Sequence, residues 1–221
     1  MGKINLFIKR MFDITVSLIC IALLLVIPVY IIVPIAIKLT SKGPALFRQV
    51  RAGKNGKSFT MYKFRTMIVE TYDNDGKEIM TENRITKIGK FLRKTSLDET
   101  PQLFNILNGT MSIVGPRPML VYQMERCEGE ELRRFEMRPG VTGLAQVKGR
   151  NNIRWPERIQ YDLNYIKNFN VILDIEIIIK TIFLVFRKEG TDVIPEYRGV
   201  DRFSKHYVPD ADSDAGKNNF L

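Results

Sequence analysis

Residues 14–37 read ITVSLICIALLLVIPVYIIVPIAI, a run of 24 residues that contains no charge. At about 1.5 Å per residue, such a run makes roughly 36 Å of helix, which is enough to span a hydrocarbon core of roughly 30 Å. The run therefore predicts that this part of the chain is a membrane-anchoring element.

Basic residues lie on both sides of this run. Lys3, Lys9 and Arg10 precede it, and the segment 38–69 contains eight lysines and arginines but no acid. Lys and Arg are enriched in the cytoplasmic flanks of membrane segments, so both ends of the run favour the cytoplasmic side of the membrane, with its anionic headgroups. Pro28 favours a kink that would return the helix to that side. Two interpretations remain open, a re-entrant helix and an ordinary anchor that crosses once, since membrane helices tolerate proline.

Composition narrows the class of protein. The formal net charge of +10 indicates anionic partners such as phospholipid headgroups, nucleotides or a phosphorylated substrate. The basic cluster adjoins the apolar run, so we expect a lipid surface and no nucleic acid. Two cysteines, at 20 and 127, and one histidine, at 206, exclude a disulfide framework, a His/Cys zinc site and a histidine-activated nucleophile. Any catalysis must therefore use Asp, Glu, Lys, Arg or a hydroxyl group.

We expect an α/β fold that is mostly helical. Residues 1–40 would form the membrane anchor, 41–207 one small domain with a short β element, and 208–221 a disordered polar tail.

Within the domain, the sequence predicts strands at 44–48 and 58–67, joined by a turn at 53–57. It predicts a loop over 70–84 and irregular structure around the glycines of 139–149. The expected helices cover 85–94, 97–107, 119–135, 155–168 and 171–188.

The expected helix over 171–188 is apolar on most of its surface. At about 100° per residue, Glu176, Lys180 and Arg187 share one narrow stripe. The pattern is typical of an interfacial helix on a bilayer or of a core helix. Asp174 falls opposite the stripe, where it either needs a paired cation or reflects the preference for acids near a helix start.

The string Ser96-Leu97-Asp98-Glu99 has two compatible interpretations. Ser-x-x-Glu is a capping box, in which Ser96 begins a helix and Glu99 reaches back to it. Two adjacent carboxylates close to many basic residues can also hold Mg²⁺ or supply a nucleophile. The capping box does not use Asp98, so this residue is available for chemistry in either case.

Stiff, basic turns follow along the chain. Gly115-Pro116-Arg117-Pro118 presents one arginine, and residues 138–143 and 148–151 form a second basic, glycine-rich region. A guanidinium group can donate two parallel hydrogen bonds to the oxygens of one phosphate, and glycine lets the backbone approach a phosphate closely. Each arginine alone is equally consistent with a solvated turn, but together with Lys63 and Arg93 they predict an anion-binding site.

Five motifs follow one another along the chain: KFRTM at 63–67, SLDETPQL at 96–103, VGPRP at 114–118, RPGVTG at 138–143 and GRN at 149–151. In this order they resemble the bacterial sugar transferase family, the monotopic polyprenol-phosphate phosphoglycosyl transferases, in its minimal form. The resemblance covers nearly the whole chain. It implies a re-entrant helix broken at Pro28 and a small cytoplasmic domain with interfacial amphipathic helices. Ile27 departs from the family, which often has Ser before this proline, and so does Leu144, where the family has an aromatic residue.

The resemblance also implies a reaction. A nucleoside diphosphate sugar, expected to be a UDP-sugar, gives its phospho-sugar to undecaprenyl phosphate and releases UMP, through a phospho-sugar bound to an aspartate. Carried onto this chain, Asp98 is the nucleophile, Glu99 binds Mg²⁺ or assists deprotonation, and both would hold the metal. Four basic residues would hold phosphates and two acids would complete the polar site: Lys63, Arg93, Arg117 and Arg150, and Asp162 and Asp174. The implied location is the cytoplasmic face of the bacterial inner membrane, where surface glycan or glycoprotein assembly begins.

Two other functions are compatible with the residues. A non-catalytic, membrane-tethered binder of anionic lipid or nucleic acid fits the composition, but gives no reason for Asp98 and Glu99. A hydrolase would transfer the phospho-sugar to water instead of a lipid. The sequence does not distinguish the sugar, the glycan pathway or the oligomeric state.

Overall fold

Helices dominate the part of the chain that the computed structural model describes, which comprises residues 3–70, 72, 83–149, 153–187 and 203. The α-helices are α1 (Lys3–Val26), α2 (Val29–Thr40), α3 (Lys87–Thr95), α4 (Gln102–Leu107), α5 (Val121–Met124), α6 (Leu144–Gly149), α7 (Trp155–Lys167) and α8 (Val171–Arg187). The 3₁₀ helices are η1 (Lys54–Gly56), η2 (Leu97–Glu99) and η3 (Gly129–Glu136), and the strands are β1 (Leu46–Ala52), β2 (Ser58–Phe64), β3 (Ser112–Val114) and β4 (Gly140–Thr142). The predicted tail over 208–221, Arg150 and most of the predicted loop over 70–84 lie outside the described residues.

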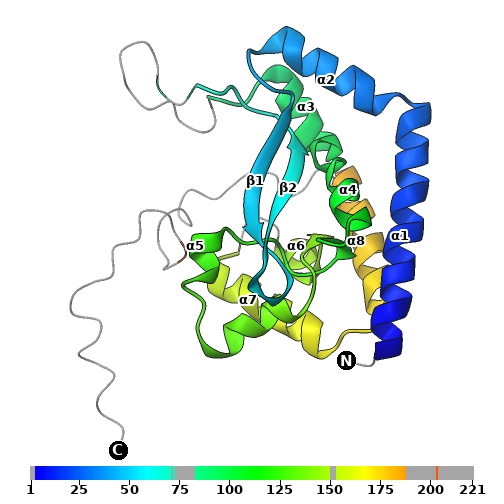
Figure 1. Ribbon diagram of the computed structural model, residues 1–221, viewed down its shortest axis with the longest axis vertical. Coiled ribbons are helices and arrows are strands. Elements are labelled where there is room, and N and C mark those ends of the chain that lie inside the picture. The colour runs from blue at the N-terminus through cyan, green and yellow to red at the C-terminus, as the bar shows by residue number, and fades with distance from the viewer. Residues whose placement is uncertain (1–2, 71, 73–82, 150–152, 188–202, 204–221) are drawn as a thin grey trace, which may run out of the picture.

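The apolar N-terminal run forms two helices with a sharp bend between them (Figure 1). α1 ends at Val26, α2 begins at Val29, and the two helices are bent by 62°. No single helix in the described part is long and apolar enough to cross a membrane, whereas the bent pair passes this requirement together. The predicted break at Pro28 is confirmed, and α2 continues through Pro34.

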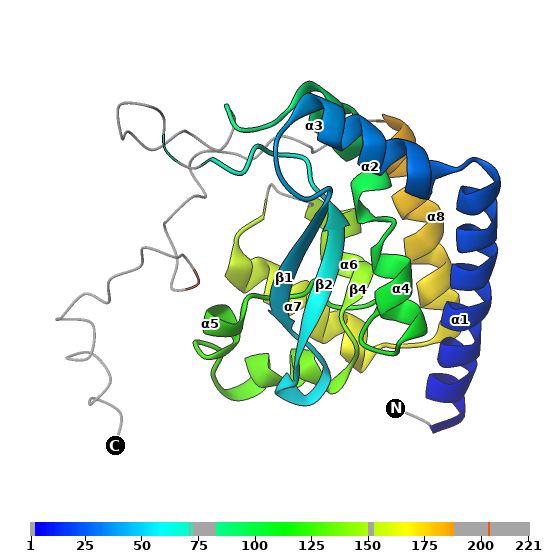
Figure 2. The same ribbon diagram turned by 45° about the horizontal axis from the view of Figure 1, so that its top comes forward.

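Polar side chains on one face of α1 bind the rest of the protein. Lys9 Nζ lies 2.6 Å from Asp174 Oδ2 on α8, which runs alongside α1 (Figure 2). The Asp13 carboxylate accepts hydrogen bonds from β3, and Arg10 donates to the last carbonyls of α4. Tyr165 also donates to Asp174, at 2.6 Å. Asp174 is therefore buried and paired with a cation, and it also lies in the first turn of α8, so both interpretations hold.

β1 and β2 form an antiparallel hairpin around η1, as the sequence predicts, although β1 is longer than expected. Gln49 lies opposite Met61, and Phe47 lies opposite Lys63. Opposite residues, and residues two apart on a strand, share a face of the sheet. Arg51 therefore shares the face of Gln49, Met61 and Lys63, and this shared face becomes one wall of the pocket described below.

Three predicted segments differ from the structure. The single helix expected over 97–107 is divided into η2 and α4. The other two differ because distant parts of the chain pack against them. The helix expected over 119–135 is divided into α5 and η3, since Met119, Cys127 and Phe135 converge on one core cluster with Ile159. The segment expected to be irregular over 139–149 instead contains α6 and β4, which pairs in parallel with β3.

Ser96 is the N-cap residue of the 3₁₀ helix η2, as predicted, but the side-chain bonds of the predicted capping box are not formed. Its backbone is left-handed, with φ 57°, and it ends α3. No side-chain hydrogen bond caps η2, and Glu99 pairs with Lys63 instead. A non-glycine residue with positive φ is uncommon and often marks a functional site. Here it redirects the chain so that Asp98 and Glu99 face the hairpin.

Asn105 joins α4 to β2 from a buried position. Its Oδ1 accepts from the Tyr62 backbone N–H at 3.1 Å, and its Nδ2 donates to the Thr60 carbonyl at 2.8 Å. In the Asn105→Ala variant both backbone groups lose these partners, so we expect the free energy of unfolding to fall by about 1–3 kcal/mol. Denaturant unfolding followed by the fluorescence of Trp155, the single tryptophan, measures the change.

The matched control is Asn164→Ala, because Asn164 is exposed on α7. Its free energy of unfolding should stay within about 0.5 kcal/mol of the unchanged protein. Equal unfolding midpoints for the two variants would contradict the role assigned to Asn105.

Candidate active site

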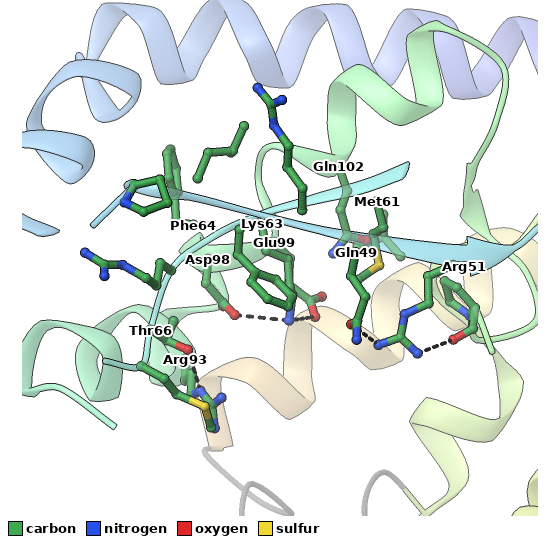
Figure 3. Close-up of a pocket in the computed structure, with 18 of the residues that line it drawn as sticks. Gln49, Arg51, Met61, Lys63, Phe64, Thr66, Arg93, Asp98, Glu99 and Gln102 are labelled. Carbon is green, nitrogen blue, oxygen red and sulfur yellow. Dashed lines mark hydrogen bonds and ion pairs between the residues drawn. The ribbon is translucent and has the colours of Figure 1, made fainter. Parts of the chain in front are cut away.

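One pocket of about 750 Å³ lies between the hairpin, α3, η2 and the turn at 115–118 (Figure 3). Segments far apart in sequence contribute its walls, so it forms only in the folded chain. Five residues that the sequence predicts for the site line this pocket: Lys63, Arg93, Asp98, Glu99 and Arg117.

Lys63 lies between the two adjacent carboxylates of η2. Its Nζ is 3.2 Å from Asp98 Oδ2 and 2.9 Å from Glu99 Oε1. Asp98 is only 5% exposed, whereas Glu99 is half-buried. The register of the hairpin brings Lys63 to the carboxylates, and the left-handed residue Ser96 turns the carboxylates toward Lys63.

The surroundings move the pKa values of the two carboxylates in opposite directions. Burial raises the pKa of Asp98, and the nearby charge of Lys63 offsets this only in part. Burial also acts to raise the pKa of Glu99, but the charges of Lys63 and Arg117 outweigh it, so this pKa lies below its ordinary value. Burial acts to lower the pKa of Lys63, but the two carboxylates outweigh it and raise that pKa. Paired acids with diverging pKa values are typical of a site in which each has its own role.

Two of the three predicted arginines lie in the described part of the chain, and their charges lower the pKa values of different carboxylates. Arg93 lies near Asp98, and its Nε donates to Thr66 Oγ1 at 2.9 Å. The charge of Arg117 acts to lower the pKa of Glu99. The pocket therefore offers a separate arginine to each carboxylate, an arrangement suited to an anion with two phosphates.

Asp162 and Asp174 do not line this pocket, so the structure corrects the expectation that they complete its polar wall. A buried carboxylate needs a counter-charge, and each of the two has its own. Asp162 pairs with the buried Arg134, whose Nη2 also donates to the Arg117 carbonyl at 3.0 Å. Asp162 thus helps to hold the turn at 115–118 in place through Arg134. Asp174 pairs with Lys9 on α1.

Sequence reasoning missed several residues of the pocket wall. Gln49, Arg51 and Gln102 line the pocket but were not among the predicted site residues. The alternation of side chains along β1 would have placed Gln49 and Arg51 on the face of Lys63, had the first strand been extended beyond residue 48.

Asp98 and Glu99 are the acidic residues of the pocket, and they could hold a magnesium ion only together with other ligands. Mg²⁺ is commonly held by one or two carboxylates together with substrate phosphates and water. Asp98 and Glu99 are adjacent, and each contacts Lys63 through one carboxylate oxygen. Within the described residues, no group of three or more His, Cys, Asp or Glu side chains could hold a metal. Phosphate oxygens would therefore have to complete the coordination.

Comparison with known proteins agrees with the motifs around this pocket. The model of the family described as "Bacterial sugar transferase" matches residues 4–188. The chain is 42% identical over 183 residues to the "Uncharacterized sugar transferase EpsL" of Bacillus subtilis, covering 83% of this chain and 89% of that protein. It is 46% identical over 198 residues to the "UDP-glucose:undecaprenyl-phosphate glucose-1-phosphate transferase" of Klebsiella pneumoniae, covering 84% of this chain and 42% of that protein.

A third relative is the "Undecaprenyl-phosphate galactose phosphotransferase" of Salmonella typhimurium, which is 39% identical over 201 residues, or 83% of this chain and 41% of that protein. The chain thus spans less than half the length of the Klebsiella and Salmonella proteins. Residues of four of the five motifs line one pocket. Because the family model matches most of the chain, the chain belongs to the bacterial sugar transferase family.

Proposed function

We propose that the protein transfers a phospho-sugar from a UDP-sugar to undecaprenyl phosphate and releases UMP, a step that would initiate surface glycan or glycoprotein assembly. The observation that carries this proposal is the buried Asp98 beside Glu99, bridged by Lys63 in an arginine-lined pocket. The names of the Klebsiella and Salmonella relatives, which specify transfer of a sugar phosphate or sugar to this lipid phosphate, support it.

In the proposed first step, an Asp98 carboxylate oxygen attacks the phosphorus that carries the sugar. The bond from that phosphorus to the bridging oxygen breaks, and UMP leaves with the electron pair. In the second step, a phosphate oxygen of the lipid attacks the same phosphorus and releases the Asp98 carboxylate. The diphosphate repels a carboxylate, so Lys63, Arg93 and Arg117 are needed to offset the charge.

Glu99 and Lys63 supply fixed charges beside the nucleophile. The low pKa of Glu99 keeps it ionised at neutral pH, and the raised pKa of Lys63 keeps it protonated. Asp98 and Glu99 would hold Mg²⁺ together with the donor phosphates, and the ion would neutralise part of their charge. Arg150 remains a predicted phosphate ligand.

We also propose that α1 and α2 enter and leave the cytoplasmic leaflet of the bacterial inner membrane. The bend of 62° supports this, and so do the basic residues at both ends. Large apolar side chains are exposed on α1, α2 and α8, among them Phe7, Leu23, Ile31, Leu39, Ile172 and Phe183. An apolar surface of this extent is costly in water and fits the interior of a leaflet.

The re-entrant arrangement predicts that both ends of the helix pair lie on one side of the membrane. Lys3→Cys and Lys42→Cys are made separately in a background with Cys20→Ala and Cys127→Ala. Because both positions would face the cytoplasm, a membrane-impermeant maleimide should label each in inside-out vesicles and neither in intact cells. Labelling of one position from outside the cell would show a straight crossing.

The nucleophile is tested by Asp98→Asn. We expect this variant to form no covalent phospho-sugar adduct, and its UMP release to fall by at least about 1,000-fold, since the amide does not attack phosphorus. Intact-protein mass after incubation with a UDP-sugar detects the adduct, and UMP release is measured with undecaprenyl phosphate present. Burial disfavours the ionised Asp98, so thermal stability should be no lower than that of the unchanged protein.

The control for charge is Glu130→Gln, which removes an exposed carboxylate from η3 and should leave activity unchanged. Without the lipid phosphate, the unchanged protein should release UMP in one burst matching the amount of enzyme and then stop. Continued release would identify a hydrolase, and an adduct in Asp98→Asn would reject the assigned nucleophile.

The raised pKa of Asp98 predicts a pH dependence. Since only the ionised carboxylate attacks, adduct formation should slow as pH falls, at a pH above the ordinary pKa of aspartate. The effect on stability has the opposite sign. A pKa that is higher in the folded state stabilises the fold below the unfolded-state pKa, and this contribution is lost as pH rises through the raised value.

Rapid-quench measurement of the first UMP burst, from acidic to neutral pH, checks the activity profile. The burst does not involve the lipid phosphate, whose own titration would interfere. A burst rate that stays constant down to the ordinary aspartate pKa would contradict the effect of burial on Asp98.

A further inference from the structure

Arg51 lies at one end of the pocket, away from the carboxylate that is the proposed nucleophile. Figure 3 shows Arg51 beside Gln49 at this end, and Thr66 and Arg93 at the other, with Lys63 between them. β1 begins close to the end of α2 and carries Arg51 toward the turn at 115–118.

The Arg51 guanidinium is held in place by two neutral acceptors. Its Nη2 donates to Gln49 Oε1 at 2.6 Å, and its Nη1 donates to the Pro118 carbonyl at 3.4 Å. Its buried Nε has no hydrogen-bond partner among the described residues. In the part of the chain that the structure describes, no carboxylate forms an ion pair with Arg51.

This guanidinium therefore carries a charge that the described residues do not balance. Burial and the nearby charge of Arg117 lower the pKa of Arg51 to about 10, so the group is still protonated at neutral pH. Burying a cation without a counter-charge is costly, and an anionic ligand would supply that charge.

Five of the other charged residues that line the pocket can be placed in spatial order, starting from the end at which Arg51 lies. The charge of Arg117 acts to lower the pKa values of Arg51 and Glu99, whereas the charge of Arg93 acts to lower the pKa of Asp98. Lys63 contacts both carboxylates. Six of the charged residues that line the pocket are therefore neighbours in the order Arg93, Asp98, Lys63, Glu99, Arg117 and Arg51.

We propose that Arg51, oriented by Gln49 and adjacent to Arg117, binds the phosphate that leaves with the nucleoside. The sugar-bearing phosphate, which Asp98 attacks, then lies toward Arg93. This inference rests on the proposed function and assigns the two phosphates of the donor to opposite ends of the row of charges.

The assignment places Arg51 where negative charge develops. When the Asp98 oxygen bonds to phosphorus, the bond to the bridging oxygen breaks, and its electron pair adds one negative charge to the phosphate of UMP. Two of the five N–H groups of Arg51 are engaged with Gln49 and Pro118, which leaves donors for this phosphate. Donors fixed before the reaction stabilise the departing charge without reorganisation.

The test is UMP binding to Arg51→Gln, measured by calorimetry on the full chain in detergent. Loss of a charge-assisted contact to phosphate should weaken UMP binding by roughly 10- to 100-fold. The burst of UMP from a UDP-sugar should slow as well. Arg51→Lys should restore part of the affinity, because it keeps the charge but not the forked geometry. Gln49→Leu should cause a smaller loss in the same direction.

The matched control is Arg133→Gln, which removes the same charge from an exposed site on η3 that pairs with Glu130 and Glu136. It should bind UMP like the unchanged protein. An equal loss in this control would show a general charge effect and overturn the assignment.

Wild-type UMP affinity in Arg51→Gln would also overturn the assignment, most clearly if the unfolding temperature of the variant fell. Arg51 would then only tie the hairpin to Pro118. If the unchanged protein formed no adduct at Asp98, the proposed function would fail. A normal adduct with wild-type UMP affinity in Arg51→Gln would reject the Arg51 subsite alone.

Discussion

One face of α1 is bound to the rest of the protein by the side chains of Lys9, Arg10 and Asp13. The position of the pocket relative to the bent helix pair depends on these contacts. Lys9 pairs with α8, Asp13 accepts from β3, and Arg10 binds the last carbonyls of α4, the helix that follows the Asp98–Glu99 turn. A buried charge needs a partner, so α1 has one favourable rotation about its axis. In that rotation its large apolar side chains face outward, toward the proposed membrane.

The bridge from Lys63 to both carboxylates has a similar role within the pocket. Without it, two neighbouring acids in a buried site would repel each other and favour protonation. With it, and with the charge of Arg117, the pKa of Glu99 lies below its ordinary value, whereas burial still raises the pKa of Asp98. Lys63 acts on both carboxylates, and the additional charge of Arg117, which acts on Glu99, distinguishes the two side chains. This difference suits one acid to attack and the other to hold charge.

Much of the fold was predictable because it follows from local patterns. Alternation predicted the hairpin, and helical periodicity predicted α3, α7 and α8 close to their observed bounds. The motifs also predicted five residues that line the pocket. The side-chain bonds of the predicted capping box are not formed, because Ser96 adopts a left-handed conformation that local sequence did not indicate. Asp162 and Asp174 were misplaced, because their partners lie 28 and 165 residues away along the chain.

By itself, the sequence determined the apolar run, its break at Pro28, the carboxylate pair and the basic turns, since each is a property of neighbouring residues. Only the tertiary structure decided which acids enter the pocket, which are neutralised elsewhere, and which way Gln49 and Arg51 face. The reason is that burial and Coulomb energy depend on distance in space. Hairpin register and helix packing set those distances between segments that are far apart in the chain.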